Sequence, residues 1–277
     1  MGFKMRLFLL ITVFSIVTLF SISSNNTYGD IRLVGSSYSD YKAEAGYTVK
    51  IPLFDRGFAN VRGQMGLSLT TLELNVDANF SFFDFLEVGG GGKVGTGWNF
   101  SGTEYKGLAI GDGISSAESN SLGGVYFNGY GKVTLKYQTG ELFKNQWLNF
   151  LLQTTQMLSY DGYIASKESI GWEFSYNGLH SDGANYKGSY LIGYQMMDIP
   201  LNLIGIEFVH RYDNIKNEFD IGSMYEINIV TNVDIGKRSS LKFIGQTGNY
   251  SINETKRTIE KNGFHFRGLK VIMSFTF

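Results

Sequence analysis

Cysteine is absent from the sequence, and this absence excludes several kinds of chemistry. There is no disulfide framework, no thiolate metal site, no thiol nucleophile and no cysteine for lipid attachment. Proline is scarce at 2 residues, whereas the chain contains 35 glycines, 17 tyrosines and 22 phenylalanines. This balance is typical of a chain built from many aromatic strands rather than helices.

An excess of charge of one sign is also missing, because the formal net charge is -1. A protein that binds nucleic acid normally carries a clustered basic surface, so we expect no nucleic-acid partner. The three histidines, His180, His210 and His265, are widely separated and match no metal-binding spacing. We therefore expect no cofactor and no metal site.

The sequence also lacks a hydrophobic run long enough to form a membrane-spanning helix. The longest uncharged, mostly apolar run covers residues 7–20 and follows Lys4 and Arg6. It is shorter than the roughly 18–20 apolar residues that a helix needs to cross a bilayer. Small residues come next, which completes the pattern of a secretory signal peptide. We predict a signal peptide over residues 1–24, cleaved somewhere within residues 21–30.

Alternation of apolar and polar side chains, the signature of a β-strand, is clearest from Leu72 to Phe82. The even-numbered residues of this segment are apolar, and the odd-numbered ones, including Glu73 and Asp77, are polar. In a soluble sandwich the apolar face would form the core, whereas in a transmembrane barrel it would face lipid. The period alone does not separate these two folds.

The last nine residues alternate in the same way and end on an aromatic side chain. One face of this segment carries Leu269, Val271, Met273, Phe275 and Phe277. An apolar stripe that closes on a C-terminal phenylalanine resembles the last strand of bacterial outer-membrane β-barrel proteins. The resemblance implies a closed antiparallel transmembrane barrel in the outer membrane, surrounded by its lipids. It also implies that the stripe is the signal recognised by the barrel-assembly machinery.

Ten segments are expected to form the wall of this all-β domain, which we place over residues 30–277. They are residues 47–53, 67–82, 86–98, 122–138, 170–179, 186–196, 203–212, 224–234, 241–250 and 269–277. An even number is what a single-chain barrel of this class requires. Residues 142–158 fit a helical period better than a period of two, so we expect a short helical insertion there. A pair of short strands in that segment would give twelve strands, and eight is the lower alternative.

The connections between these segments fall into two length classes. The short class is residues 83–85, 198–200 and 235–240, and the long class is residues 100–121, 177–185, 213–218 and 251–263. Outer-membrane barrels have short periplasmic turns and longer external loops. We therefore expect the two classes at opposite ends of the barrel.

The polar faces of the strands are expected to point inward and to carry charges of both signs. The expected lumen charges are Glu73, Asp77, Glu87, Lys93, Lys132, Lys136, Glu173, Glu207, Arg211, Glu226 and Lys242. Opposite charges across a narrow lumen would pair and plug it, because buried charges require partners. About eight strands leave room only for side chains, whereas water-filled porins use about 16–18 strands.

We therefore expect a mostly occluded lumen and a surface-exposed structural or interaction role. The alternative is a narrow porin-like channel for ions or small solutes, in which the inward charges set selectivity. The long hydrophilic loops at residues 100–121 and 251–263 are candidates for contact with a host component or another surface ligand.

A lipid-modifying enzyme is the third interpretation. Some outer-membrane barrels carry such an activity with a His and a Ser near the external rim, which directs attention to His180 with Ser181 and to His265. However, His180 lies in an expected external loop, where an exposed polar residue needs no special reason. We therefore expect no enzymatic activity.

Overall fold

The computed structural model describes most of the chain beyond the N-terminal segment. The described residues are 27–36, 41–54, 57–98, 107–111, 118–119, 124–140, 149–164, 171–175, 178–196, 199–213, 222–252 and 258–277. The predicted signal peptide at residues 1–24 lies outside them. Within the described part of the chain, no helix has both the length and the apolar composition needed to cross a bilayer.

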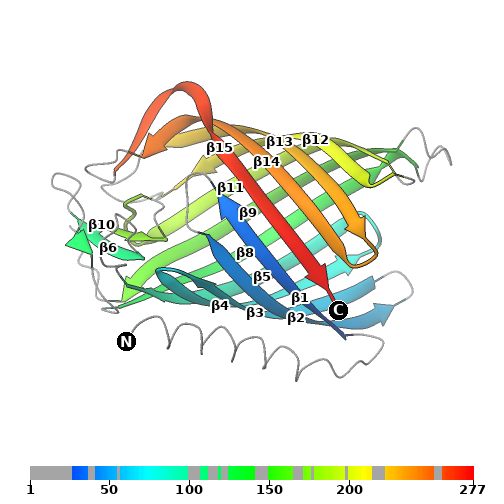
Figure 1. The fold of residues 1–277 in the computed structure, drawn as a ribbon, viewed down its shortest axis with the longest axis horizontal. Coiled ribbons are helices and arrows are strands. Elements are labelled where there is room, and N and C mark those ends of the chain that lie inside the picture. Colours follow the sequence, from blue (N-terminus) through cyan, green and yellow to red (C-terminus); the bar gives the residue numbers. More distant parts are fainter. Residues whose placement is uncertain are drawn as a thin grey trace.

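Twelve antiparallel strands close into a barrel (Figure 1). They are β1 (Thr27–Ser36), β2 (Lys42–Phe54), β3 (Gly57–Ser68), β4 (Thr71–Phe82), β5 (Leu86–Gly97), β8 (Val125–Gln138), β9 (Phe150–Ile164), β11 (Gly183–Gln195), β12 (Leu201–Tyr212), β13 (Ser223–Gly236), β14 (Ser239–Ile252) and β15 (Ile259–Thr276). The order around the wall is β1-β15-β14-β13-β12-β11-β9-β8-β5-β4-β3-β2. Each strand therefore pairs with the next wall strand in sequence, and β1 pairs with β15 to close the circle.

A separate three-stranded sheet lies at one end of the barrel. It has the order β10-β6-β7 and consists of β6 (Leu108–Gly111), β7 (Glu118–Ser119) and β10 (Gly171–Phe174). Its strands come from the connection between β5 and β8 and from the connection between β9 and β11. Figure 1 shows β6 and β10 at the end of the barrel opposite the chain terminus marked C.

The all-β class, the closed antiparallel barrel and the even strand number are confirmed, and the wall has twelve strands, the upper alternative to the expected ten. Three wall strands, β1, β3 and β9, escaped the sequence prediction. Conversely, the wall strand predicted at residues 170–179 is not part of the wall. That segment forms only β10, which belongs to the small three-stranded sheet.

The helical insertion predicted at residues 142–158 is wrong for its second half, because β9 begins at Phe150. Residues 141–148 lie outside the described residues. The outer face of β9 carries Thr154 and Gln156 among apolar residues, while the inner face carries Leu151 and Met157. Since each face is mixed, the two-residue period is lost, and the apolar positions imitate a helical spacing.

The connections named for the short and long classes lie at opposite ends, as expected. Two other connections depart from the rule, because the two-residue turn between β3 and β4 lies at the external end and the longer connection between β8 and β9 lies at the periplasmic end. The turns at residues 83–85 and 237–238 are at the end where β1 begins and β15 finishes. By the rule for this class, that end is periplasmic, and the small sheet is external. The predicted loop at residues 251–263 is shorter than expected, because β14 runs to Ile252 and β15 begins at Ile259.

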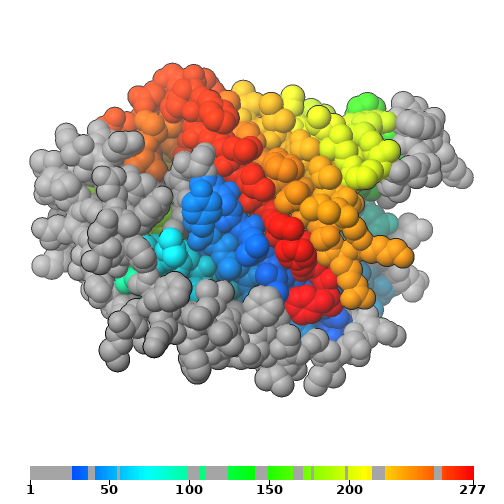
Figure 2. Space-filling model, viewed as in Figure 1, coloured from blue at the N-terminus to red at the C-terminus, as the bar shows by residue number. Residues whose placement is uncertain are grey.

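The outer surface of the wall is apolar. Val76, Leu158, Ile192, Ile206 and Ile229 point outward from five different strands and are 58–63% exposed. Figure 2 shows one face of this surface, where β1, β14 and β15 lie side by side. A soluble monomer rarely exposes an apolar area that extends around the molecule, whereas a transmembrane barrel requires one.

Candidate functional site: the barrel lumen

The polar faces of the wall strands line the lumen. On β4, for example, Leu74 and Val76 are exposed on the outside, whereas Glu73 is buried on the inside. Ten of the expected lumen charges occupy inward positions on wall strands: Glu73, Asp77, Glu87, Lys93, Lys132, Lys136, Glu207, Arg211, Glu226 and Lys242. The wall therefore carries a charged interior on an apolar exterior.

Glu173 is the exception, because it belongs to β10 and not to the wall. Its side chain is fully buried, and its Oε1 accepts a hydrogen bond of 2.8 Å from the backbone amide of Gly178. The prediction that Glu173 is a wall charge of the lumen is wrong. The error arose because four consecutive residues of β10 are buried, so burial there follows the external sheet and not the barrel alternation.

Ion pairs join the strands on one side of the lumen. Arg62 Nη2 on β3 lies 2.8 Å from Asp30 Oδ2 on β1, and Lys42 Nζ on β2 lies 3.0 Å from Glu73 Oε2 on β4. Each pair crosses an intervening strand at a glycine. A Cβ atom at Gly46 would lie 2.7 Å from Arg62 Nη2, and one at Gly66 would lie 3.2 Å from Lys42 Cδ. These inward glycines leave the space through which the long side chains reach their partners.

Further pairs extend this arrangement. Lys42 also contacts Glu44 at 2.9 Å, and Lys93 lies 3.6 Å from Glu73. Nearer the periplasmic end, Lys132 pairs with Glu87 at 3.1 Å. Because these cations share carboxylates, their charges are largely neutralised within the wall.

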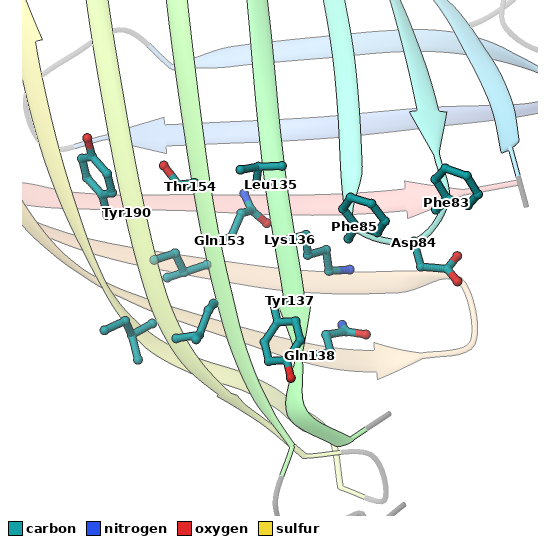
Figure 3. A pocket seen from close by; sticks show the side chains of 13 residues that line it. Phe83, Asp84, Phe85, Leu135, Lys136, Tyr137, Gln138, Gln153, Thr154 and Tyr190 are labelled. Carbon is teal, nitrogen blue, oxygen red and sulfur yellow. The ribbon is translucent and has the colours of Figure 1, made fainter. Parts of the chain in front are cut away.

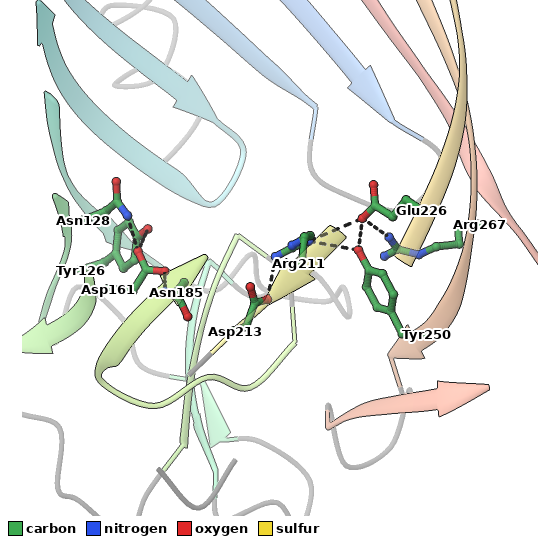
Figure 4. Close-up of polar contacts among 9 residues, drawn as sticks. All are labelled: Tyr126, Asn128, Asp161, Asn185, Arg211, Asp213, Glu226, Tyr250 and Arg267. Atoms are coloured by element: carbon green, nitrogen blue, oxygen red, sulfur yellow. Dashed lines mark hydrogen bonds and ion pairs between the residues drawn. The ribbon is translucent and has the colours of Figure 1, made fainter. Parts of the chain in front are cut away.

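A second charged cluster lies on β12 to β15 (Figure 4). Glu226 Oε1 is 3.1 Å from Arg267 Nη1 and 3.7 Å from Arg211 Nη1, and it accepts a hydrogen bond from the hydroxyl of Tyr250. Arg211 Nη2 also pairs with Asp213 Oδ2 at 2.7 Å. The buried carboxylate of Glu226 is therefore satisfied by three neighbouring groups.

Asp161 on β9 is held without a cation (Figure 4). Its Oδ1 accepts hydrogen bonds from Tyr126 Oη at 3.0 Å and from Asn128 Nδ2 at 2.5 Å, and its Oδ2 accepts one from Asn185 Nδ2 at 2.6 Å. These contacts link β8, β9 and β11 on the inner face. They fix the position of the Tyr126 ring.

The external sheet packs against this inner face. Phe174 of β10 stacks on Tyr126 with ring centroids 4.5 Å apart, and Trp172 lies 5.4 Å from the same ring. Trp172 Nε1 donates a hydrogen bond of 2.8 Å to Asp182 Oδ1. Together with Leu108 and Tyr163, these aromatic residues form a buried cluster. The sheet therefore narrows the external mouth of the barrel.

A polar cavity of about 550 Å³ lies beneath this cluster. Six cationic side chains and four carboxylates line it: Lys42, Lys93, Lys187, Arg211, Arg267, Lys270, Glu73, Asp161, Asp213 and Glu226. Within the described part of the chain, Lys187 and Lys270 form no ion pair. Cationic groups therefore exceed carboxylates around this part of the lumen.

A second hollow of about 910 Å³ lies outside the wall near the periplasmic end (Figure 3). Outward side chains of β8, β9 and β11 line it, including Leu135, Tyr137, Leu152 and Ile192, together with Phe83 and Phe85 of a short turn. Asp84 and Lys136 also line this hollow, and neither of them lines the lumen cavity.

Several lumen residues were missed at the level of the sequence. They are Asp30, Arg62, Lys42, Glu44, Asp161, Lys187, Arg267, Lys270 and Tyr250. Asp30 and Arg62 lie on strands that were not predicted. Lys270 could have been found, because it lies opposite the apolar stripe of the terminal strand and so must face inward.

The histidines considered for catalysis have different surroundings. His180 is buried, lines the cavity and pairs its backbone with Trp172, with the two rings 5.8 Å apart. Ser181 is buried beside it. His265 lies on β15, where its Nδ1 is 2.8 Å from the carbonyl oxygen of Gly263. The residues that the structure describes contain no group of three or more metal-ligating side chains.

The residues of the expected assembly signal share one face of β15. Leu269, Val271, Met273 and Phe275 point outward, and Phe277 follows at the periplasmic rim with 40% of its surface exposed. The stripe thus belongs to the lipid-facing surface of the closing strand.

No protein-family model and no curated protein sequence matches this chain. Solved structures do match the fold. An outer membrane channel from Pseudomonas putida F1 has a TM-score of 0.56 at 10% identity, over 91% of this chain and 95% of that chain. LpxR from Salmonella typhimurium has a TM-score of 0.47 at 7% identity, over 90% and 99%. The translocator domain of autotransporter NalP from Neisseria meningitidis has a TM-score of 0.45 at 8% identity, over 99% and 95%.

The protein therefore has the fold of the bacterial outer-membrane β-barrel proteins. Its closed wall of twelve strands with an apolar exterior places it in that membrane. The expected class and location are confirmed.

Proposed function

We propose that this protein is a narrow outer-membrane channel that prefers small anions. One observation carries the proposal: the lumen cavity is lined by more cationic groups than carboxylates, and two of its lysines have no acidic partner in the described chain. An excess of one sign of charge in a passage with low-dielectric walls concentrates ions of the opposite sign.

The dimensions support a narrow passage rather than a general diffusion pore. Twelve strands give a bore between the filled interior of an eight-stranded barrel and the open channel of a barrel of about 16–18 strands. The external sheet narrows this bore further, since Phe174 and Trp172 pack against Tyr126 on the inner wall. We propose transport without any catalytic step.

A mostly occluded barrel with a surface interaction role is the second candidate. The ion pairs of Glu73 and Glu226 favour it, because paired charges that bridge the strands fill the lumen instead of lining an open path. In that case the external loops would bind a surface ligand. For either role, we propose outer-membrane lipids and the barrel-assembly machinery as partners.

Ion currents through the refolded protein in a planar bilayer separate these functions. Under a tenfold gradient of KCl, we expect discrete openings and a reversal potential of the sign that chloride permeation produces. The double substitution Lys187→Glu, Lys270→Glu should move the reversal potential toward that of potassium. Lys237→Glu, Arg238→Glu makes the same charge change in a periplasmic turn and should leave it near the wild-type value.

A folded protein that conducts no ions would refute the channel function and would favour the occluded barrel with an interaction role. Heat-modifiable migration on a gel verifies that each variant has closed into a barrel. Openings that select potassium in the wild-type protein would also contradict the proposal.

A further inference from the structure

We infer that the lumen cavity contains a binding site for a compact anion with two or more carboxylate or phosphate groups, held chiefly by Lys187 and Lys270. The inference rests on the proposed function, because the bound anion would be the solute that the channel conducts.

The two lysines reach the cavity from separate parts of the wall. Lys187 lies on β11 and Lys270 lies on β15, and both line the cavity of about 550 Å³. They lie within electrostatic range of each other, and Lys270 also lies within range of Lys42, Lys242 and the carboxylate of Glu44. Because Glu44 and Glu73 pair with Lys42, the uncompensated positive charge in the cavity comes chiefly from Lys187 and Lys270.

Lys187 and Lys270 differ from the other cations of this cavity in having no contact partner. Lys42 and Lys93 contact Glu73, while Arg211 and Arg267 contact Glu226. Within the described residues, Lys187 and Lys270 form neither an ion pair nor a side-chain hydrogen bond. Lys187 is within electrostatic range of Glu226, but that carboxylate is already engaged by Arg267 at 3.1 Å.

Gln246 supplies an independent polar group at the same place. It lines the cavity from β14, the strand between Lys270 on β15 and Glu226 on β13. Its side-chain oxygen is buried and has no hydrogen-bond partner. Buried polar atoms of this kind are rare in folded proteins unless water or a ligand completes them. The oxygen itself can only accept a hydrogen bond, but in the opposite amide orientation Nε2 takes its place and would donate to a bound anion.

The presence of two lysines from different strands in one cavity favours a multivalent anion over a halide. One small ion can contact one ammonium group closely, but it cannot neutralise two that come from different strands. An anion with two charged groups can accept a charge-assisted hydrogen bond from each lysine. The carboxylates of the cavity do not compete, because Glu73 and Glu226 are held by other cations and Asp161 by three neutral donors.

Thermal unfolding of the refolded full-length barrel in detergent tests this site without requiring ion conduction. The probes are citrate and pyrophosphate, each compared with chloride at equal ionic strength. A ligand that binds only the folded state raises the unfolding temperature as its concentration increases. We expect a saturable rise with at least one probe and none with chloride.

Variants then locate the binding. Lys187→Gln, Lys270→Gln should abolish the rise, and Lys270→Arg should retain it. Because these two cations pair with no carboxylate among the described residues, removing them leaves no buried carboxylate without its partner, and these variants are expected to fold. Lys237→Gln, Arg238→Gln, which removes the same charge from a periplasmic turn, should behave as the wild-type protein.

A rise with citrate alone assigns the site to carboxylates, and a rise with pyrophosphate alone assigns it to phosphates. No rise with either probe, or a rise that persists in Lys187→Gln, Lys270→Gln, overturns the site. If the anion raises the unfolding temperature but no current is recorded in the bilayer, the anion-binding site is supported and the channel function is refuted. If anion-selective currents occur but neither probe raises the unfolding temperature, the channel function is supported and the anion-binding site is refuted.

Discussion

Gly29 and Phe277 exchange two backbone hydrogen bonds across the seam that closes the barrel. The amide of Gly29 donates to the carbonyl oxygen of Phe277 over 3.1 Å, and the amide of Phe277 donates to that of Gly29 over 3.0 Å. The ring of Phe277 lies over Gly29, since a Cβ atom there would be 2.6 Å from Phe277 Cε2. The terminal aromatic residue is therefore seated at the junction of the first and last strands.

Gly29→Ile is expected to weaken this closure. The added side chain would displace the Phe277 ring, and overpacking of this kind typically costs about 1–3 kcal/mol. The fraction of heat-modifiable, folded barrel after refolding should fall, and the unfolding temperature should drop. Gly63→Ile is the matched control, because a Cβ atom at Gly63 on the outer face of β3 meets nothing within 4 Å. Equal behaviour of the two variants would contradict the proposed role of the seam.

Gly46→Leu is expected to separate Arg62 from Asp30. The new side chain would occupy the space now crossed by the guanidinium group, and the buried carboxylate of Asp30 would keep only its contact of 2.9 Å with Arg32. A buried group that loses a hydrogen-bond partner typically costs about 1–3 kcal/mol. Urea unfolding should show this loss of stability. In an Arg62→Ala background the same substitution should cost less, and an equal cost would show that the ion pair is not involved.

Phe174→Ala is expected to widen the external mouth. The substitution removes the ring that stacks on Tyr126 at 4.5 Å and so loosens the external sheet from the inner wall. If the lumen conducts, single-channel conductance should increase, or a closed barrel should begin to open. Phe264→Ala is the control, because Phe264 is 56% exposed on β15. Unchanged conductance in Phe174→Ala would mean that another part of the lumen limits the current.

Glu73→Gln is expected to strengthen the preference for anions. Glu73 Oε2 holds Lys42 at 3.0 Å and Lys93 at 3.6 Å, so its neutralisation leaves more uncompensated positive charge beside the cavity. The reversal potential in a KCl gradient should move closer to that of chloride. Asp84→Asn changes the charge equally in a periplasmic turn and should produce a smaller shift. A shift toward potassium in Glu73→Gln would be incompatible with a lumen whose cations govern selectivity.

The lumen charges were predictable only where the strand alternation was regular. The period of two placed Glu73 and Asp77 correctly on the inner face of β4, because Leu74 and Val76 mark the opposite face without ambiguity. The same reasoning failed for Glu173, whose segment folds into the external sheet. Asp161 was not considered, because both faces of β9 mix polar and apolar residues.

The sequence by itself determined the all-β class, the membrane-facing side of the regular strands and the location in the outer membrane. These properties follow from a side-chain period of two and from the terminal aromatic strand, which are local features of the chain. Tertiary structure decided the strand number, since β1, β3 and β9 are recognised by their pairing with neighbouring strands and not by a local alternation. It also decided which charges are neutralised: Lys42 and Glu73, separated by 31 residues, meet because the register of β2, β3 and β4 places Gly66 between them. Among the described residues, Lys187 on β11 and Lys270 on β15 are left without such a partner by the pairing of their own strands, which no local pattern encodes.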